Sequence, residues 1–284
     1  MAKRKMLDGI AYVFIGLSAG ISVALLLGIL FYVLGKGVGT INWQFLTTVP
    51  SSLKGTFGIA GNLLNTLYII IITLLLATPI GVGSAIYLNE YARPGKLVRF
   101  IEFTTETLSG IPSIIFGLFG MVFFGNLFHL GYSILTGALT LTLMVLPLIT
   151  RNTQEALKTV PESYRAGAMG IGATKWYMIR TVLLPSAMPG IITGVILSIG
   201  RIVGESAALL FTAGSGYLLP KSAMGYLDKV LEPGGTLTIQ LYLCMSKAEY
   251  DKAFGIALVL LVIVLCINAL TKVLARQYDV TRKE

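Results

Sequence analysis

The stretch YRAGAMGIGATKWYMIRTVLLP, residues 164–185, joins two long apolar runs of the chain. Gly170 and Gly172 interrupt it and mark a bend. After the bend, Trp176, Ile179 and Val182 recur at the spacing of one helical face. The stretch therefore predicts two short amphipathic helices joined at glycine, set between segments that are themselves apolar.

Two roles are open for this helical pair. Basic residues flank its aromatic and aliphatic stripe, which is the pattern of a helix lying on a lipid surface. The same pattern suits a helix presented to the groove of a partner protein. Periodicity alone does not choose between them.

The composition places the rest of the chain in a membrane. Of 284 residues, 55% are hydrophobic and only 12% are charged, whereas about a quarter of the residues of a soluble domain are charged. The mean hydropathy is +0.81. Six apolar runs of about 20 residues, the length that spans a bilayer, predict an all-α polytopic membrane protein with six transmembrane helices: Ile10 to Leu34, Leu63 to Leu88, Leu108 to Leu127, Tyr132 to Ile149, Met188 to Ala213 and Phe254 to Leu274.

The distribution of basic residues predicts the orientation of these spans. The first run is too long for a signal peptide and lacks a clear cleavage site, so we expect it to be retained. An even number of spans puts both termini on one side. Most basic residues of the connecting segments fall on the side of the termini, which the positive-inside rule makes cytoplasmic: Lys3, Arg4, Lys5, Arg93, Lys96, Arg99, Arg151, Lys158, Arg165, Lys175, Arg180, Lys272, Arg276, Arg282 and Lys283.

Several function classes lose support at this stage. The net charge of +9 is explained by orientation and by contact with anionic lipid, so we assign no nucleic-acid role. His129 is the only histidine and makes neither a metal site nor a catalytic dyad. Cys244 and Cys266 fall in an outside loop and in the last helix, so no disulfide is expected. We predict no catalytic residue and no metal ligand.

Residues 166–185 resemble the cytoplasmic loop that recurs in permeases of ATP-binding-cassette importers. That loop has the pattern E-A-A, three residues, Gly, nine residues, Ile, one residue, Leu-Pro. Here Gly172 takes the place of the glycine, Val182 that of the isoleucine, and Leu184 and Pro185 end the pattern. The start departs from the pattern, because Ala166, Gly167 and Ala168 stand where E-A-A would be. The resemblance implies that the segment 151–185 docks on an ATPase, with Trp176 on its surface.

Four other stretches are similar to the A-type permease subunits of phosphate-specific importers. They are TPIGVGSAIYLNEYA (78–92), GIPSIIFGLFG (110–120), GRIVGESAALLFTAG (200–214) and TLTIQLY (236–242). The resemblance implies the type I importer permease fold, with a permease core at 63–284 that follows an N-terminal tail, first helix and outside loop at 1–62. It also implies a set of partners, namely a second, related permease, an ATPase homodimer and an extracytoplasmic phosphate-binding protein.

The chain has no G-x-x-x-x-G-K-[ST] loop for nucleotide phosphates. We therefore expect it to be a transport subunit and not an enzyme, with no cofactor of its own. ATP and magnesium would bind to the partner ATPase. The expected location is the inner membrane of a prokaryote.

Arg201 and Glu205 are the two charges inside the predicted fifth helix. A charge near the bilayer centre costs at least about 2.5–3.5 kcal/mol, so both should avoid lipid. Their spacing of four residues would put them on one helical face, where they could pair. Either they merely neutralise each other, or Arg201 faces the substrate pathway and offers phosphate a bidentate contact, with Glu205 holding it in place.

Two smaller features are also open to interpretation. The SGIP turn, residues 109–112, supplies either backbone N–H groups for an anion or an ordinary helix start with proline in its first turn. Small residues in the spans are expected to serve close helix packing: Gly81, Gly83, Gly117, Gly120, Gly194 and Gly200.

Three function classes remain: a primary-transport permease, a secondary transporter or channel, and an intramembrane enzyme. The enzyme has the least support, because no nucleophile with its base and no metal cluster recurs at membrane depth. The permease of an ATP-driven phosphate importer explains the loop, the charged pair and the lack of a catalytic set. A permease for another oxyanion, of the sulfate or molybdate class, would look the same, because an arginine fork also accepts those anions. A secondary anion transporter or channel could use the charged pair but would not need the docking loop.

Overall fold

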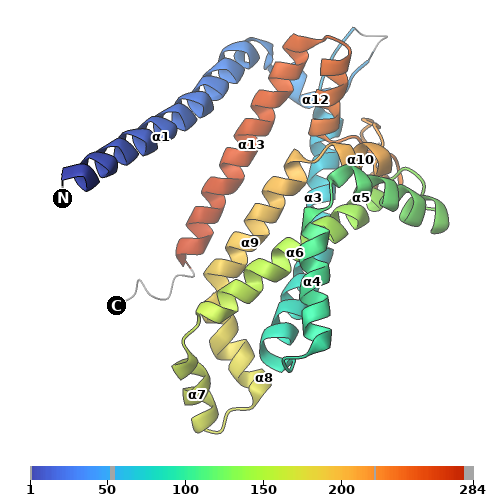
Figure 1. The fold of residues 1–284 in the computed structure, drawn as a ribbon. Helices are drawn as coiled ribbons and strands as arrows, with labels where there is room; N and C mark the ends of the chain where they lie inside the picture. Colours follow the sequence, from blue (N-terminus) through green and yellow to red (C-terminus); the bar gives the residue numbers. More distant parts are fainter. Residues whose placement is uncertain (1, 52–54, 221, 278–284) are drawn as a thin grey trace.

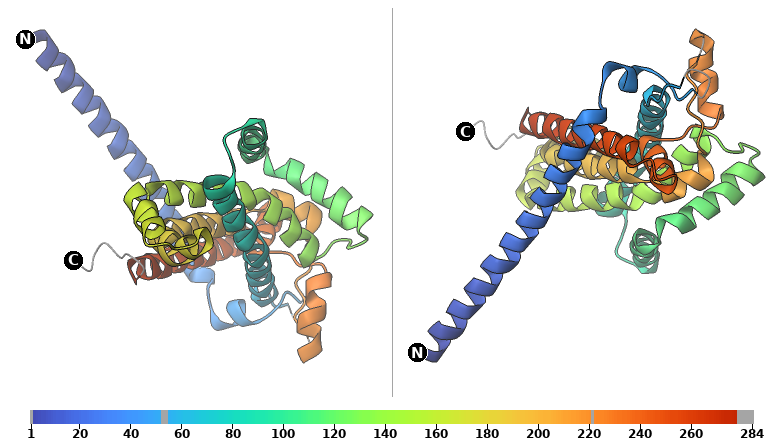
Figure 2. Two further views of the ribbon diagram at one scale, coloured as in Figure 1. Left: turned by 90° about the horizontal axis from the view of Figure 1, so that it is seen from below. Right: turned by 90° about the horizontal axis from the view of Figure 1, so that it is seen from above.

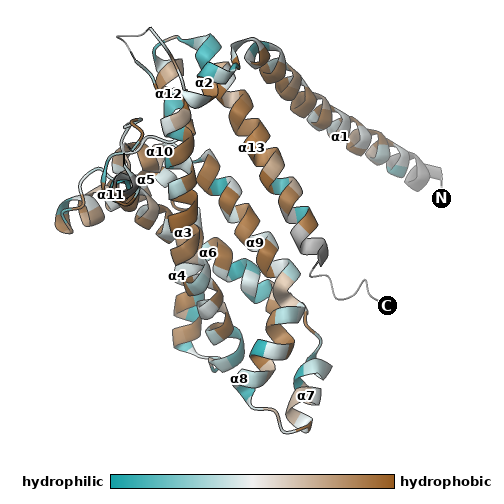
Figure 3. Cartoon of the chain, turned by 180° about the vertical axis from the view of Figure 1, so that it is seen from behind, coloured by the Kyte–Doolittle hydropathy of each residue, from teal (hydrophilic) through white to brown (hydrophobic). Residues whose placement is uncertain are grey.

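The computed structural model describes residues 2–51, 55–220 and 222–277, and these form a bundle of helices (Figure 1). One isolated bridge joins Ser51 to Thr56, and the described residues contain no longer strand pairing. The long helices are apolar over most of their length, whereas α7 and α8 carry more polar residues (Figure 3). The helices of five residues or more are α1 (Ala2–Gly37), α2 (Trp43–Thr47), α3 (Ala60–Ile86), η2 (Tyr87–Tyr91), α4 (Lys96–Gly110), α5 (Ser113–Gly120), η3 (Met121–Leu127), α6 (Ile134–Thr159), α7 (Glu162–Gly170), η4 (Ile179–Leu183), α9 (Leu184–Gly204), α10 (Ala207–Thr212), α11 (Ala223–Asp228), α12 (Leu237–Ser246) and α13 (Tyr250–Gln277). Three shorter ones are η1 (Val38–Thr40), α8 (Lys175–Met178) and η5 (Lys229–Leu231).

The prediction of an all-α membrane protein is confirmed. Among the described residues, 5 helical runs are long and apolar enough to cross a membrane: Asp8–Thr40, Ala60–Tyr91, Ile134–Thr159, Lys175–Gly204 and Tyr250–Leu270. A bent pair of helices gives a sixth when it is counted as one span.

The third predicted span differs from its prediction. In place of one helix from Leu108 to Leu127, α4 and the α5–η3 run meet at a bend of 102°. The bend falls at Ile111 and Pro112, which both have extended backbones. Proline cannot continue the helix before it, because its ring excludes the helical conformation of the preceding residue.

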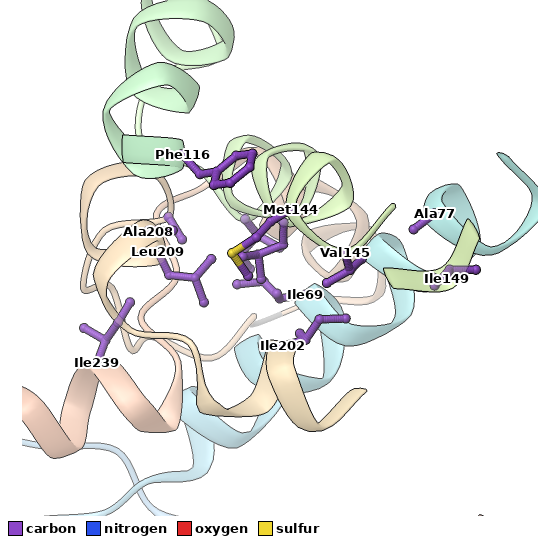
Figure 4. Packing of buried hydrophobic residues seen from close by; sticks show 13 residues of the cluster. Ile69, Ala77, Phe116, Met144, Val145, Ile149, Ile202, Ala208, Leu209 and Ile239 are labelled. Carbon is purple, nitrogen blue, oxygen red and sulfur yellow. The ribbon is translucent and has the colours of Figure 1, made fainter. Parts of the chain in front are cut away.

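Helix α6 is the centre of the bundle. Its apolar window is 67% buried inside the chain, against 28% for the spans built on α3, α9 and α13. Met144, Val145 and Ile149 of α6 pack with Ile69 of α3 and Leu209 of α10 (Figure 4). Because other helices cover α6 on most sides, α6 is the element against which they pack.

Most of the glycines expected at helix crossings are indeed there. A Cβ on Gly117 would lie 2.8 Å from the Cα of Ala208, and one on Gly81 would lie 2.8 Å from Cγ2 of Ile149. Gly120 and Gly194 likewise face Thr140 and Asn152 closely. Gly83 and Gly200 lie at no crossing within the described chain, since a Cβ there would meet nothing within 4 Å.

Gly117 is packed against α10 and Gly83 faces open space, so an added methyl group should affect the two differently. Gly117→Ala should destabilise the protein by about 1–3 kcal/mol, because backbone atoms of α10 cannot yield to the added methyl group. Gly83→Ala is the matched control, since in open space alanine favours a helix by about 0.5–1 kcal/mol over glycine. Thermal unfolding of the detergent-solubilised protein would measure both, and equal midpoints would contradict the packing role of Gly117.

One end of α3 holds a glycine-rich connection. Asn62 Nδ2 donates to the carbonyl of Gly235 at 2.9 Å, and Asn65 Nδ2 donates to the carbonyl of Gly216 at 2.8 Å. The hydroxyl of Thr66 accepts from the backbone N–H of Leu237 at 3.0 Å. The first turns of α3 therefore hold Gly216, Gly235 and Leu237 in place.

Helix α1 stands apart from the bundle (Figure 2). None of its apolar window is buried inside the chain. It meets the bundle near its C-terminal end, where Tyr32 packs edge-on against Phe254 at 5.4 Å between ring centroids. Gly37 lies so close to α13 there that a Cβ would lie 2.9 Å from the Cβ of Leu258.

Candidate functional site

The helix that carries Arg201 ends three residues later. Helix α9 ends at Gly204, and Glu205 has an extended backbone with φ −79° and ψ 128°. The Oε1 atom of Glu205 accepts a hydrogen bond from the backbone N–H of Ala208 at 3.0 Å, so this carboxylate caps the start of α10. The carbonyl of Glu205 accepts from the hydroxyl of Thr238 at 2.7 Å. The predicted fifth span, Met188 to Ala213, is thus two helices with a break at Glu205.

The predicted contact between Arg201 and Glu205 does not form. No ion pair in the described part of the chain joins them. Side chains four residues apart share a helical face only where both residues are helical, and here α9 ends before Glu205. The carboxylate is also turned toward the N–H groups of the next helix, which attract its charge.

Arg201 lies on an exposed face of α9. Exposed residues follow one another along this face at helical spacing: Thr193, Leu197, Gly200, Arg201 and Gly204. Gly200 and Gly204 add no side chain beside the arginine, and the space around each is open. Among the described residues, the Arg201 side chain has no hydrogen-bonding or ion-pairing partner. Its charge is therefore available to a group from outside this chain.

Arg201 lines a cavity of about 230 Å³ between three helices. Helix α4 contributes Thr105, Glu106 and Ser109, and α6 contributes Met144, Pro147, Leu148 and Arg151. The cavity thus holds two arginines, one carboxylate and two hydroxyls. The two hydroxyls donate within α4, to the carbonyls of Ile101 and Glu106, so the net positive charge of the two arginines is what suits a small anion.

Arg151 also lines the cavity, although the sequence predicts it in the docking loop. It was predicted as the first residue of the cytoplasmic docking loop, but α6 continues through it to Thr159. Its partner Glu155 lies one turn further on, at 3.4 Å, and both side chains are exposed. A sequence signal did exist, because Met144, Pro147, Leu148 and Arg151 follow the spacing of one helical face.

Ser109 of the SGIP turn reaches the same cavity. Its hydroxyl donates to the carbonyl of Glu106 at 2.7 Å, within α4. Of the two interpretations of this turn, the structure shows a helix start at Ser113 after Pro112, and it places Ser109, the first residue of the turn, at the same cavity as Arg201.

The predicted docking segment 151–185 is built as a helical hairpin. Its first nine residues belong to α6, and its last two open α9. Between them, α7 and α8 are joined at Gly172, whose φ of +83° is the left-handed conformation that favours glycine. The hydroxyl of Thr174 accepts from the backbone N–H of Tyr177 at 3.4 Å and so caps α8. Figure 1 shows α7 and α8 together at one end of the molecule.

The predicted stripe of Trp176, Ile179 and Val182 is wrong in its register. Trp176 is 58% exposed, Ile179 is fully buried, and Val182 is half-buried. A π-helical run, η4, begins at Ile179, and its wider turn rotates the residues that follow. The buried face is formed instead by Met178, Ile179 and Leu183.

The hairpin therefore has a packed base and an exposed tip. At the base, Met178, Ile179 and Leu183 pack with Leu157 and Ala187 in one apolar cluster, against which Ala168 and Leu184 also lie. Exposed at the tip or along its sides are Ala166, Gly167, Gly172, Trp176 and Pro185. Large apolar side chains are exposed there as well, including Tyr164, Met169, Ile171 and Tyr177. Ile171, at the turn itself, is 87% exposed.

A second cavity, of about 470 Å³, lies at the end of the molecule that carries α12. Cys244 is buried in its wall, and burial raises the pKa of the thiol, with Glu249 adding to the rise. A smaller fraction is thiolate at any given pH, so maleimide should label Cys244 at neutral pH at least about tenfold more slowly than after unfolding in detergent. The measurement uses a Cys266→Ser background, and fast labelling of the folded protein would contradict it.

Comparison with known proteins identifies the family that has this fold. The family model described as "Binding-protein-dependent transport system inner membrane component" matches residues 77–280. The chain belongs to this family. Its match covers α6, the α7–α8 hairpin and the cavity around Arg201.

Relatives in the transport family are similar over most of the chain. "Probable ABC transporter permease protein YqgI" of Bacillus subtilis is 44% identical over 211 residues, which are 74% of this chain and 72% of that protein. "Phosphate transport system permease protein PstA 2" of Mycobacterium bovis is 32% identical over 93% of this chain and 86% of its own length. The PstA protein of Haemophilus influenzae is 30% identical, with 94% and 92% covered.

Solved structures of transporters show the same fold. A bacterial alginate ABC transporter, solved in complex with an alginate-bound periplasmic protein, matches with a TM-score of 0.70 at 15% identity and covers 96% of each chain. The MetNI methionine ABC transporter, in an inward-facing conformation, matches with a TM-score of 0.59 at 21% identity, covering 78% of this chain and 94% of that one. The chain is thus a multi-pass inner-membrane permease of the ABC importer class, with the type I fold, and acts as a transport component and not as an enzyme.

Proposed function

We propose that the chain is the permease subunit of an ATP-driven importer of inorganic phosphate. Relatives named as phosphate transport permeases align over nearly its whole length, and this supports the substrate class. The observation that carries the proposal is the unpaired Arg201 at a cavity with two arginines, beside Met144 near the middle of α6.

The cavity has the chemistry that passage of an anion needs. An unpaired arginine is too costly to face lipid, so its exposed face on α9 must meet water or another protein. A phosphate entering there could accept a bidentate bond from the Arg201 fork and a further bond from Arg151. Glu106 adds a negative charge, which weakens the hold on the anion and favours its release.

The proposed partners follow from the class and from the exposed surfaces. A second, related permease would cover the Arg201 face of α9 and complete the pathway. An ATPase homodimer, which binds ATP and magnesium, would receive the exposed apolar tip of the α7–α8 hairpin. An extracytoplasmic binding protein would deliver phosphate. Both termini and the hairpin would be cytoplasmic, and the division into 1–62 and 63–284 stays a prediction.

The proposed mechanism couples the hairpin to the pathway. Binding of ATP would close the ATPase dimer, and the hairpin would pass this movement to the spans as a rigid body. The pathway would then open outward, accept phosphate and return after hydrolysis. Coupling requires that the hairpin make different contacts in the two nucleotide states.

Uptake of labelled phosphate tests the proposed substrate. Cells lacking this chain should lose ATP-dependent uptake, and re-expression should restore it, with excess unlabelled sulfate failing to compete. Competition by sulfate or molybdate would assign the chain to another oxyanion. Uptake that follows an ion gradient after depletion of ATP would favour a secondary transporter.

A further inference from the structure

A short π-helical turn, η2, ends α3 beside the docking hairpin. Glu90 in this turn has a side chain that is only 6% exposed. Its Oε1 atom accepts from Nη2 of Arg165, on α7, at 3.1 Å, and from the amide of Asn89 at 2.7 Å. A buried carboxylate at the end of one span is thus tied to the first helix of the hairpin, 75 residues away in the sequence.

Arg165 connects three elements through one guanidinium. Besides Glu90, it donates to the carbonyls of Leu157 at 2.9 Å and Val160 at 3.0 Å, which are free because α6 ends at Thr159. It also meets the exposed carboxylate of Glu162 at 3.2 Å. The planar fork with five donors fixes the direction of each bond, so α7 cannot slide past η2 without breaking several of them.

The second helix of the hairpin contacts the neighbouring residue of the same turn. Lys175, at the start of α8, lies 4.9 Å above the ring of Tyr91 in a cation–π contact. Both helices of the hairpin therefore hold η2 through two consecutive residues. The apolar base of the hairpin also reaches α3, at Val82 and Ile86, but apolar contacts have no fixed direction.

Helix α3 extends from this contact to the other end of the bundle (Figure 1). There, Asn62, Asn65 and Thr66 bind the connection that precedes α12, at Gly216, Gly235 and Leu237. The same connection leads into Thr238, whose hydroxyl binds the carbonyl of Glu205, four residues after Arg201. A displacement of η2 along α3 would consequently reach the segment next to the candidate anion cavity.

We propose that Glu90 and Tyr91 are positioning residues that transmit movement of the α7–α8 hairpin to α3, and through α3 to the distant connection at Gly216 and Gly235. This inference rests on the proposed docking of the hairpin on an ATPase. It assigns the transmission to a particular ion pair and ring contact. Neither residue touches the anion, so both act on coupling and not on substrate binding.

The test measures phosphate transported per ATP hydrolysed by the complex purified through a tag on this chain and reconstituted in vesicles. Glu90→Gln should leave the yield of assembled complex and its ATP hydrolysis within about twofold of wild type, while the ratio of transport to hydrolysis falls at least about tenfold. Glu90→Asp keeps the negative charge on a shorter side chain, so its ratio of transport to hydrolysis should lie between those of Glu90→Gln and wild type. Glu249→Gln, which breaks the Lys252–Glu249 pair at the other end of the molecule, is the control and should leave the ratio unchanged.

Tyr91→Leu is a second variant that leaves no buried charge without a partner. Tyr91 is 46% exposed, so its loss should not prevent folding, and the ratio should fall about two- to fivefold. An unchanged ratio in both Glu90→Gln and Tyr91→Leu would overturn the inference. So would a Glu90→Gln complex that fails to assemble together with a Tyr91→Leu complex of normal ratio. A wild-type complex that moves no phosphate would instead overturn the proposed function.

Discussion

Replacing Arg201 with glutamine should reduce phosphate uptake about 10- to 100-fold at normal expression. The side chain stays polar and similar in length but loses its charge and its fork, and hydrogen bonds to a charged group contribute about 1.5–3 kcal/mol. Because Arg201 has no partner within the described residues, its removal leaves no other side chain unpaired. Uptake of labelled phosphate in cells that lack the native chain measures the effect.

Two companion variants separate charge from geometry. Arg201→Lys keeps the charge without the bidentate fork and should retain an intermediate rate. Arg99→Gln removes an exposed arginine of α4 outside the cavity and should leave uptake unchanged. Full uptake by Arg201→Gln would rule out an essential role for this cation.

Replacing Gly172 with valine should reduce recovery of the ATPase with this chain at least about tenfold. The turn requires φ of +83°, which costs a residue with a Cβ about 1–2 kcal/mol, and more when that residue is β-branched. The turn should relax and separate α7 from α8, so the apolar tip would lose its shape. Co-purification through a tag on this chain measures the loss.

Gly131→Val is the matched control for strain. Gly131 also has a positive φ, of +57°, and open space around it, but it lies between η3 and α6, outside the hairpin. It should produce a similar loss of stability and a normal recovery of the ATPase. If both variants lose the ATPase equally, the effect comes from general destabilisation and the docking assignment fails.

The sequence was sufficient for the spans, because an apolar run of bilayer length leaves the backbone few alternatives to a helix. All but one of the six predicted runs overlap a long apolar helical run of the structure. The prediction of the third span, Leu108 to Leu127, is wrong because it rested on hydropathy alone. Pro112 ends α4, and the mixed polar and apolar residues 96–110 form a helix without an apolar run of their own.

The candidate site could be predicted only in part. Arg201 stood out because a lone charge in an apolar run is costly, whichever residue it meets. The role of Glu205 was not predictable from spacing, since a carboxylate can either pair with a neighbour or cap a helix, and the break in the backbone decides between them. Arg151 was missed because a basic residue at the end of a span is ordinarily an orientation signal.

The contact between the hairpin and η2 was beyond sequence reasoning for a different reason. Glu90 and Arg165 belong to separate elements, and nothing in their local patterns links them. The π-helical turn that presents Glu90 is a departure from the ordinary helical period, so face assignments based on 3.6 residues per turn fail there. The same departure at η4 explains the wrong register of the Trp176 stripe.

The isolated position of α1 determines how this chain adapts to neighbours. A helix of 36 residues is about 54 Å long, and α1 is anchored near one end by Tyr32 and Gly37. A tilt of about 10° at this anchor would move the free end by about 9 Å, because the helix is rigid over its length. The bundle contacts only one end of the first span, so we expect surrounding lipid and neighbouring subunits to set its direction.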